Sequence, residues 1–238
     1  MMRTIFAWVL SAAMGVPALA QDYELRSKGC YETANPEQTI EACSTVITSG
    51  RVDREDLATA FKNRGNAYDD KGQYDLAIED YDHAIAINPN DADALNNRGT
   101  SYRAKGKYDL AVLDYDQAIK LIPNNAKALS NRCFSKALAD QLEQGLADCN
   151  ESLRLRPGDA NALASRGFTY LKLKRYEAAI ADYDAALLIH PGNPFTLFGR
   201  GMAKRMTGNP SGGDADMVAA KAVKPDIAEE MAKLGVRP

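Results

Sequence analysis

The sequence predicts an all-α protein, a solenoid of antiparallel helix pairs, and three observations lead to this fold class. Prolines recur at intervals of 34 residues, at Pro89, Pro123, Pro157, Pro191 and Pro225. Within each interval, apolar and small residues follow the spacing of two successive helices, and each proline ends the second helix. The chain lacks the strict alternation that is typical of strands, so it is interpreted as repeats of one helical unit.

The 238 residues divide into four parts on this basis. A signal peptide is expected over residues 1–20 and an N-terminal helical cap over residues 21–57. The repeats fill residues 58–227, and residues 228–238 are expected to form a C-terminal capping helix and tail. The five units are 58–91, 92–125, 126–159, 160–193 and a degenerate 194–227.

The first segment has the pattern of a secretory signal. Arg3 precedes an apolar stretch, and Ala18 and Ala20 place small residues at −3 and −1 of a cut before Gln21. A retained membrane anchor is the alternative, but an apolar stretch of about 17 residues is marginal for crossing a bilayer. The mature protein is therefore expected to be periplasmic or secreted, without stable membrane insertion, in an oxidising compartment.

The N-terminal cap is predicted to be another helix pair. Residues 23–33 are expected to form its first helix. Asn35 and Pro36 begin the second, as a capping side chain followed by proline at the first helical position. Ser49 and Gly50 end it.

Each repeat unit is predicted to hold two helices separated by a short break. Glycines such as Gly65 and Gly99 fall within the first helix, where glycine costs about 1 kcal/mol relative to alanine. Their recurrence indicates close approach of the facing helix. Tyrosines that recur at three repeat positions are interpreted as packing between repeats, in preference to a stacking surface for bases or sugars. The breaks fall at Gly72, Gly106, Asp140, Lys174 and Gly208.

The third and fifth units depart from this pattern. The third has Cys133 and Cys149 in place of the usual glycine and tyrosine, and Lys136 in place of another tyrosine. A degenerate fifth unit is expected, because the end of a repeat stack faces solvent. Residues 226–234, closed by Gly235, are predicted to form the final capping helix.

The four cysteines are predicted to pair within hairpins, Cys30 with Cys43 and Cys133 with Cys149. Residues equidistant from the turn of an antiparallel helix hairpin lie side by side, and both pairs are centred on a predicted turn. Buried free thiols are the alternative. The expected oxidising compartment favours disulfides. A four-thiolate metal site is not expected, because the two pairs lie far apart in the stack.

The repeats resemble the tetratricopeptide repeat family over residues 58–227. The resemblance implies a right-handed superhelix whose concave face is lined by the first helix of each pair and binds peptides or protein segments. A weaker resemblance links the cap and repeats to exported proteins of Gram-negative bacteria. In the first unit the matching residues are Gly65, Tyr68, Gly72, Tyr74, Ala77, Tyr81, Ala84 and Pro89.

The sequence contains no recognisable catalytic constellation. His83 and His190 occupy different repeat positions and are predicted to be exposed, and no nucleophile elbow or phosphate-binding loop occurs. Asp80, Asp114 and Asp182 recur at one position of the second helix and are interpreted as a solvated face. We therefore expect no enzyme activity, no metal and no cofactor. The net charge of −3 argues against nucleic acid as a partner.

The candidate binding surface is the inner face of the first helices. Its lining is predicted to change from polar at the N-terminal end to apolar at the C-terminal end, which suits an extended segment with one polar terminus. The candidate lining residues are Lys62, Asn63, Asn66, Asp69, Asp70, Asn96, Asn97, Arg103, Lys127, Asn131, Phe134, Phe168, Leu171, Phe198, Met202 and Arg205.

Part of this surface is similar to the two-carboxylate clamp of co-chaperones in the family. Lys62, Asn66, Asn97 and Lys127 match four of its five positions, while the fifth would be arginine and is Asn131 here. Ammonium and amide donors are suited to binding a terminal carboxylate. The neighbouring aspartates weaken this interpretation.

The predicted function is that of a non-enzymatic scaffold or adaptor of the bacterial cell envelope, which binds a protein or peptide in its concave groove. One alternative is a self-assembling structural protein that uses an exposed patch of Phe195, Phe198 and Met202. Another is an accessory subunit or hydrolase of envelope metabolism, with a site assembled across repeats. The partner and the oligomeric state stay open.

Overall fold

The computed structural model describes residues 28–32 and 35–237. The predicted signal peptide and most of the helix expected over residues 23–33 lie outside these residues. Within the described part, residues 28–31 form a helical turn, and every longer element is an α-helix. These helices are α2 (Pro36–Ser49), α3 (Arg54–Asp70), α4 (Tyr74–Ile87), α5 (Ala92–Ala104), α6 (Tyr108–Leu121), α7 (Ala126–Leu138), α8 (Leu142–Leu155), α9 (Ala160–Lys172), α10 (Tyr176–Ile189), α11 (Pro194–Met206), α12 (Pro210–Val223) and α13 (Ile227–Lys233).

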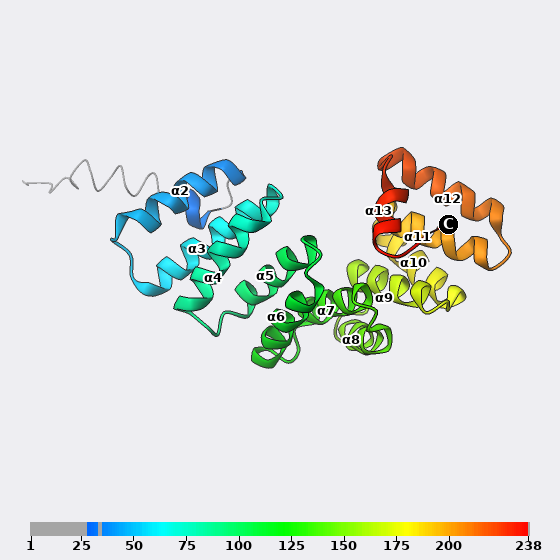
Figure 1. Cartoon of the computed structure of the whole chain (residues 1–238), viewed down its shortest axis with the longest axis horizontal. Helices are drawn as coiled ribbons and strands as arrows, with labels where there is room; N and C mark the ends of the chain where they lie inside the picture. The colour runs from blue at the N-terminus through cyan, green and yellow to red at the C-terminus, as the bar shows by residue number, and fades with distance from the viewer. Residues whose placement is uncertain (1–27, 33–34, 238) are drawn as a thin grey trace, which may run out of the picture.

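The helices pack as successive pairs along a curved path. α3 packs on α4, α5 on α6, α7 on α8, α9 on α10 and α11 on α12, and the second helix of each pair contacts the first helix of the next. The pairs follow an arc, with α3 to α5 on one side of an open centre and α11 to α13 on the other (Figure 1). The predicted all-α solenoid of helix pairs is therefore confirmed.

Capping side chains set where the first helix of each pair begins. Four of them occupy the last position before a repeat unit and accept hydrogen bonds from N–H groups of the first turn. Before the first unit this position is Leu57, which has no acceptor, and α3 instead extends upstream to its cap at Asp53. The four caps that follow the repeat interval are Asp91, Asn125, Asp159 and Asn193.

The turn inside each pair contains a residue with left-handed backbone geometry at the predicted break. The five φ angles lie between 58° and 85°. Glycine adopts this geometry without strain in three pairs, whereas Asp140 and Lys174 have side chains there. A side chain at such a position costs about 1 kcal/mol.

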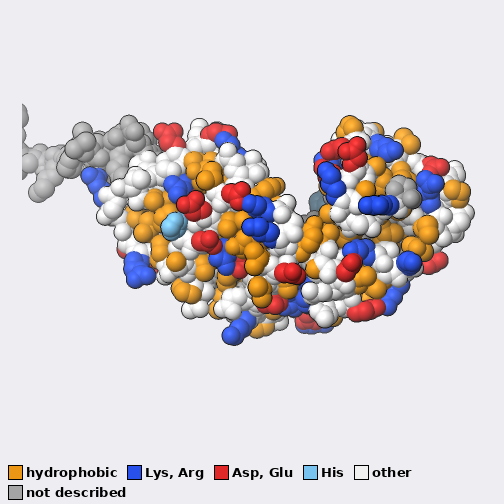
Figure 2. Space-filling view, viewed as in Figure 1, with side chains coloured by type: hydrophobic (Ala, Val, Ile, Leu, Met, Phe, Trp, Pro, Cys, Tyr) orange, Lys and Arg blue, Asp and Glu red, His pale blue; other side chains and the backbone are white. Residues whose placement is uncertain are grey.

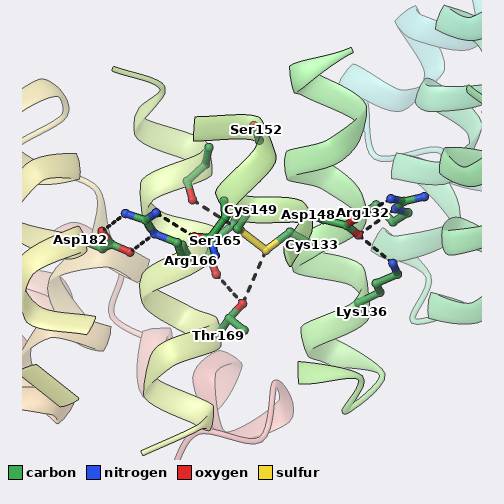
Figure 3. Close-up of a disulfide and its surroundings, with 12 residues drawn as sticks. Arg132, Cys133, Lys136, Asp148, Cys149, Ser152, Ser165, Arg166, Thr169 and Asp182 are labelled. Carbon is green, nitrogen blue, oxygen red and sulfur yellow. Dashed lines mark hydrogen bonds and ion pairs between the residues drawn. A yellow bond between two sulfur atoms is a disulfide. The ribbon is translucent and has the colours of Figure 1, made fainter. Parts of the chain in front are cut away.

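The core of a pair is built on a glycine of the first helix that faces a tyrosine of the second. A Cβ atom added to Gly65 would lie 2.9 Å from the ring of Tyr81, which is 1 % exposed. The second and fourth pairs repeat this contact. In the third pair the same two positions hold Cys133 and Cys149, which form a disulfide with a Cα–Cα distance of 5.4 Å (Figure 3). The crosslink therefore replaces a packing contact.

The second disulfide joins the N-terminal turn to α2. It links Cys30 to Cys43 across a Cα–Cα distance of 4.6 Å. Cys43 and Val46 of α2 are fully buried beside Ala60 of α3. The pairing within hairpins that the sequence favours is the one present in the structure, and it fastens the N-terminal turn to α2 within the cap.

An arginine at the seventh position of every unit pairs with the aspartate 16 residues further on. Nε and Nη2 donate to the two carboxylate oxygens at 2.5 to 2.8 Å. The aspartates are only 3 to 7 % exposed, so the interpretation of this position as a solvated face is wrong. Each carboxylate is buried because an arginine from the first helix covers it. These pairs, the Arg–Asp ladder, are Arg64–Asp80, Arg98–Asp114, Arg132–Asp148, Arg166–Asp182 and Arg200–Asp216.

The ladder also connects neighbouring pairs. Nη1 of Arg98 donates to Asp82 of the preceding pair at 2.6 Å, and Nη1 of Arg166 donates to Asn150 at 3.0 Å. In the third unit, Lys136 replaces a tyrosine. Its Nζ donates to the carboxylate of the ladder residue Asp148 at 2.8 Å, so this aspartate has a second cation beside it. Figure 3 shows two rungs of the ladder on either side of the central disulfide.

The C-terminal helix lies against the inner side of the stack. α13 contacts α11 and α12, and its Ile227 and Met231 are at most 1 % exposed. The chain turns at Gly235, with φ of 86°, and Val236 donates its N–H to the carbonyl of Met231 at 2.9 Å. Both faces of this contact are apolar, and they belong to one core cluster with Phe198 and α9.

Candidate functional site

The concave side of the stack contains a hollow of about 840 Å³, which we call the main hollow. Residues of α5, α7, α9 and α11 form one side of it and residues of α13 the other. Figure 2 shows the indentation between the N-terminal half of the stack and the C-terminal end. The lining residues that matter below are Arg103, Asn131, Phe134, Phe168, Phe195 and Met231.

Aromatic side chains form the floor of the main hollow. Phe134 and Phe168 occupy the same position of consecutive units, so the stacking of repeats brings them together. Their rings meet edge to face, with centroids 5.1 Å apart and planes at 68°. Phe195 at the start of α11 is 39 % exposed. Aromatic pairs of this geometry contribute about 0.5–1.5 kcal/mol beyond their buried area, and a ligand ring can extend the series.

A single arginine stands at the end of this floor. The guanidinium carbon of Arg103 lies 5.4 Å from the centroid of the Phe134 ring. Within the described part of the chain, this guanidinium makes no hydrogen bond and no ion pair. Its donors are therefore available to an anion that enters the hollow.

A second, polar hollow of about 270 Å³ lies towards the N-terminal end and shares Asn131 with the first. The oxygen of Asn66 accepts hydrogen bonds from the Tyr81 hydroxyl at 2.8 Å and from the Asn97 amide at 2.9 Å. Ser101 donates to Asp69 at 2.5 Å. Burial raises the pKa of Asp69, despite that hydrogen bond.

The structure does not assemble the carboxylate clamp that the sequence suggested as an alternative. Lys62 is outside both hollows and pairs with Asp91 at 2.7 Å. The amide groups of Asn97 and Asn131 already donate to neighbouring asparagines. Lys127 alone brings a cation to the polar hollow, and two aspartates line it. This arrangement is poorly suited to a second carboxylate.

At its apolar end, the predicted lining differs from the structure, and the prediction is corrected here. Leu171, Phe198 and Met202 were expected to be accessible but are 6 %, 0 % and 6 % exposed. They belong to one core cluster with Ile227 and Met231 of α13. Phe168 is also buried, at 4 %, although its ring borders the main hollow. The patch predicted for self-assembly is therefore reduced to Phe195.

Three further candidates lie away from the hollows. Asn63 donates to the carbonyl oxygen of Cys30 at 2.8 Å, and Asn96 is 1 % exposed. Arg205 is exposed and forms an ion pair with Asp214 at 3.3 Å. Part of the lining that the sequence did not predict comes from α13 and the residue after it, at Glu230, Met231, Lys233 and Leu234. No repeat signal marks these residues, because the helix lies beyond the last unit.

Among the described residues, no group of three or more His, Cys, Asp or Glu side chains is placed to hold a metal ion. None of the described helices combines the length and the apolar character needed to cross a bilayer.

The fold defines a class of helical-repeat solenoids, and solved structures share it. A tetratricopeptide repeat protein from Parabacteroides merdae is similar with a TM-score of 0.70 and 14% identity, over 90% of this chain and 87% of that one. YrrB, described as a tetratricopeptide repeat protein with an unusual peptide-binding site, has a TM-score of 0.56 and 19% identity, over 82% and 99%. MamA has a TM-score of 0.56 and 20% identity, over 76% and 97%.

The family model for the tetratricopeptide repeat matches residues 58–91, 92–125 and 160–193. The chain therefore contains tetratricopeptide repeats. The unmatched third unit is the one in which the disulfide replaces the glycine and the tyrosine. No curated protein is significantly similar to the sequence.

Proposed function

We propose that this protein is a non-enzymatic scaffold that binds an extended segment of another protein in its concave groove. The observation that carries the proposal is the main hollow, which combines an aromatic floor with a guanidinium that makes no hydrogen bond or ion pair in the described chain. Burial of apolar side chains with a few oriented polar groups is the usual composition of a binding site. The peptide-binding site named for the similar YrrB structure supports the same use of the fold.

We further propose that the scaffold works in the bacterial periplasm or outside the cell. The first twenty residues have the signal-peptide pattern, and the two disulfides suit an oxidising compartment. Fractionation of cells that express the full chain tests this part. Retention of the unprocessed chain in the cytoplasm would contradict it.

Site-specific photocrosslinking in cells tests the groove itself. A photoreactive phenylalanine analogue at Phe195 should give discrete crosslinked products, because this side chain borders the main hollow and is accessible. The matched control is the same analogue at Leu188 of α10, which is 85 % exposed and does not line the hollow. Equal product patterns at the two positions would refute binding in the groove.

A further inference from the structure

The surroundings of Arg103 differ from those of the ladder arginines. The five ladder arginines each hold a buried aspartate through two hydrogen bonds. Arg103 lies at the end of α5, half-buried, with its guanidinium over Phe134 and without such a carboxylate in the described chain. Asp69 is near enough to be affected by its charge, but the two form no ion pair. Arg103 is therefore a donor group directed at the hollow.

The other charged residues of the main hollow leave it with an excess of positive charge. Lys105 is paired with Asp75, and Glu230 is paired with Lys224 at 2.9 Å. Lys233 adds a further cation from α13. The positive charge of the main hollow is thus complementary to a carboxylate of a ligand. The aspartates of the polar hollow repel such a carboxylate.

Spacing along the floor limits how an extended ligand can use it. The step from Arg103 to Phe134 is 5.4 Å and that from Phe134 to Phe168 is 5.1 Å. Alternate side chains of an extended strand point the same way, about 6.6 Å apart. A carboxylate held by Arg103 therefore places the side chain two residues away over the aromatic floor. Asn131 borders both hollows, so the ligand chain can continue past Arg103.

We infer that the main hollow selects an internal acidic residue and, two residues away, an aromatic or large aliphatic residue of an extended protein segment. This inference rests on the proposed function, since it names the ligand that the groove takes. Arg103 holds the carboxylate, and Phe134, Phe168 and Phe195 contact the apolar side chain.

A display library of random twelve-residue peptides, with both ends joined to carrier sequence, tests the inference on the purified mature protein. Wild type should enrich peptides with an acid two positions from an aromatic residue. Arg103→Gln should weaken binding of the selected peptides by about tenfold or more. Arg103→Glu should enrich basic residues in place of the acid. The matched control is Arg205→Gln, since Arg205 occupies the same position of the fifth unit but is outside the hollows. It should enrich the same peptides as wild type.

The outcomes separate the two proposals. Enrichment of peptides without the acid, with another spacing, or equally by wild type and Arg103→Gln would overturn the inference and leave the groove function standing. Failure of wild type to enrich any peptide would overturn both. Melting curves check that the variants fold, which we expect because Arg103 makes no hydrogen bond or ion pair within the described chain.

Discussion

Neutralising one aspartate of the Arg–Asp ladder should destabilise the protein by an amount set by the arginine's other contact. Asp114 and Asp182 form a matched pair, because both are 6 % exposed and both accept two hydrogen bonds from their arginine. Nη1 of Arg98 also reaches the carboxylate of Asp82, whereas Nη1 of Arg166 reaches the neutral Asn150. Asp182→Asn thus removes the only carboxylate that Arg166 contacts within the described residues.

The magnitude follows from the burial of the pair. Removing one partner of a buried ion pair costs about 3–5 kcal/mol, because the other charge is left without compensation. The side chains of Arg98 and Arg166 are 19% and 23% exposed, and asparagine keeps one acceptor. We therefore expect a cost of about 2–3 kcal/mol for Asp182→Asn. Asp114→Asn should cost about 1 kcal/mol less, because Arg98 keeps its ion pair with Asp82. This difference is the upper value for an exposed ion pair.

The ion pair between Arg98 and Asp114 shows why single and double replacements should differ in their cost to stability. Hydrogen bonding to Asp114 raises the pKa of Arg98, while burial raises the pKa of Asp114. Desolvation of the carboxylate therefore offsets much of the attraction. Replacing both residues by apolar ones of similar size, Arg98→Met with Asp114→Leu, should cost less than Asp114→Asn alone.

Urea unfolding followed by circular dichroism measures these differences, with the slope compared among variants to detect loss of cooperativity between repeats. Two results would refute the reasoning. One is a cost below about 0.5 kcal/mol for Asp182→Asn, the value of an ordinary surface change. The other is a larger cost for Asp114→Asn than for Asp182→Asn.

Four further changes have defined outcomes. Lys174→Gly should raise the melting temperature, with a gain of about 0.5–1 kcal/mol from relief of its left-handed backbone, and a lowered one would contradict this. Burial raises the pKa of Asp69, so its contribution to stability is present below its ordinary pKa and is lost as pH rises through the raised value. Asp69→Asn should therefore stabilise more at pH 7 than at pH 3, and equal shifts in melting temperature would argue against it. Replacing Cys133 and Cys149 by serine should cost about 3 kcal/mol in urea unfolding, and free thiols in the unreduced wild type would show that the bond is absent. Deleting residues 225–238 should uncover Phe198 and Met202, giving increased binding of a hydrophobic dye, and unchanged dye binding would contradict the role of α13.

Much of the fold is predictable from the sequence, because the repeat makes each local signal recur. The proline interval, the capping residue before four of the units and the glycine at three of the turns give the same boundaries independently. Before the first unit the capping position holds Leu57, so the repeat interval does not predict where α3 begins. This helix starts four residues earlier, at Arg54, and is longer than the other first helices. The cysteines were also predictable, since Cys133 and Cys149 replace a glycine and a tyrosine that face each other in the other pairs.

The candidate site was predictable only in part. Helix periodicity places Phe168, Phe198 and Met202 on the concave side but does not show what covers that side. Phe198 and Met202 are buried in a core cluster shared with α13, and no repeat position records this contact between segments. The ladder was visible as an arginine in every unit, but a recurring aspartate by itself has the pattern of a solvated helix face. Only its geometry shows that the two positions meet.

The ladder and the groove depend on each other because they use the same helices. Each first helix presents its ladder arginine to two second helices and its groove residues to the concave side. Arg98 fixes α5 against α4 and α6, and Arg103 lies five residues further along the same helix. A groove residue on a helix held at both neighbours loses little freedom when a ligand binds, and a preformed site of this kind favours affinity. Weakening the ladder at Arg98 should therefore lower the affinity of peptides that Arg103 holds, although Arg98 itself is outside the hollow.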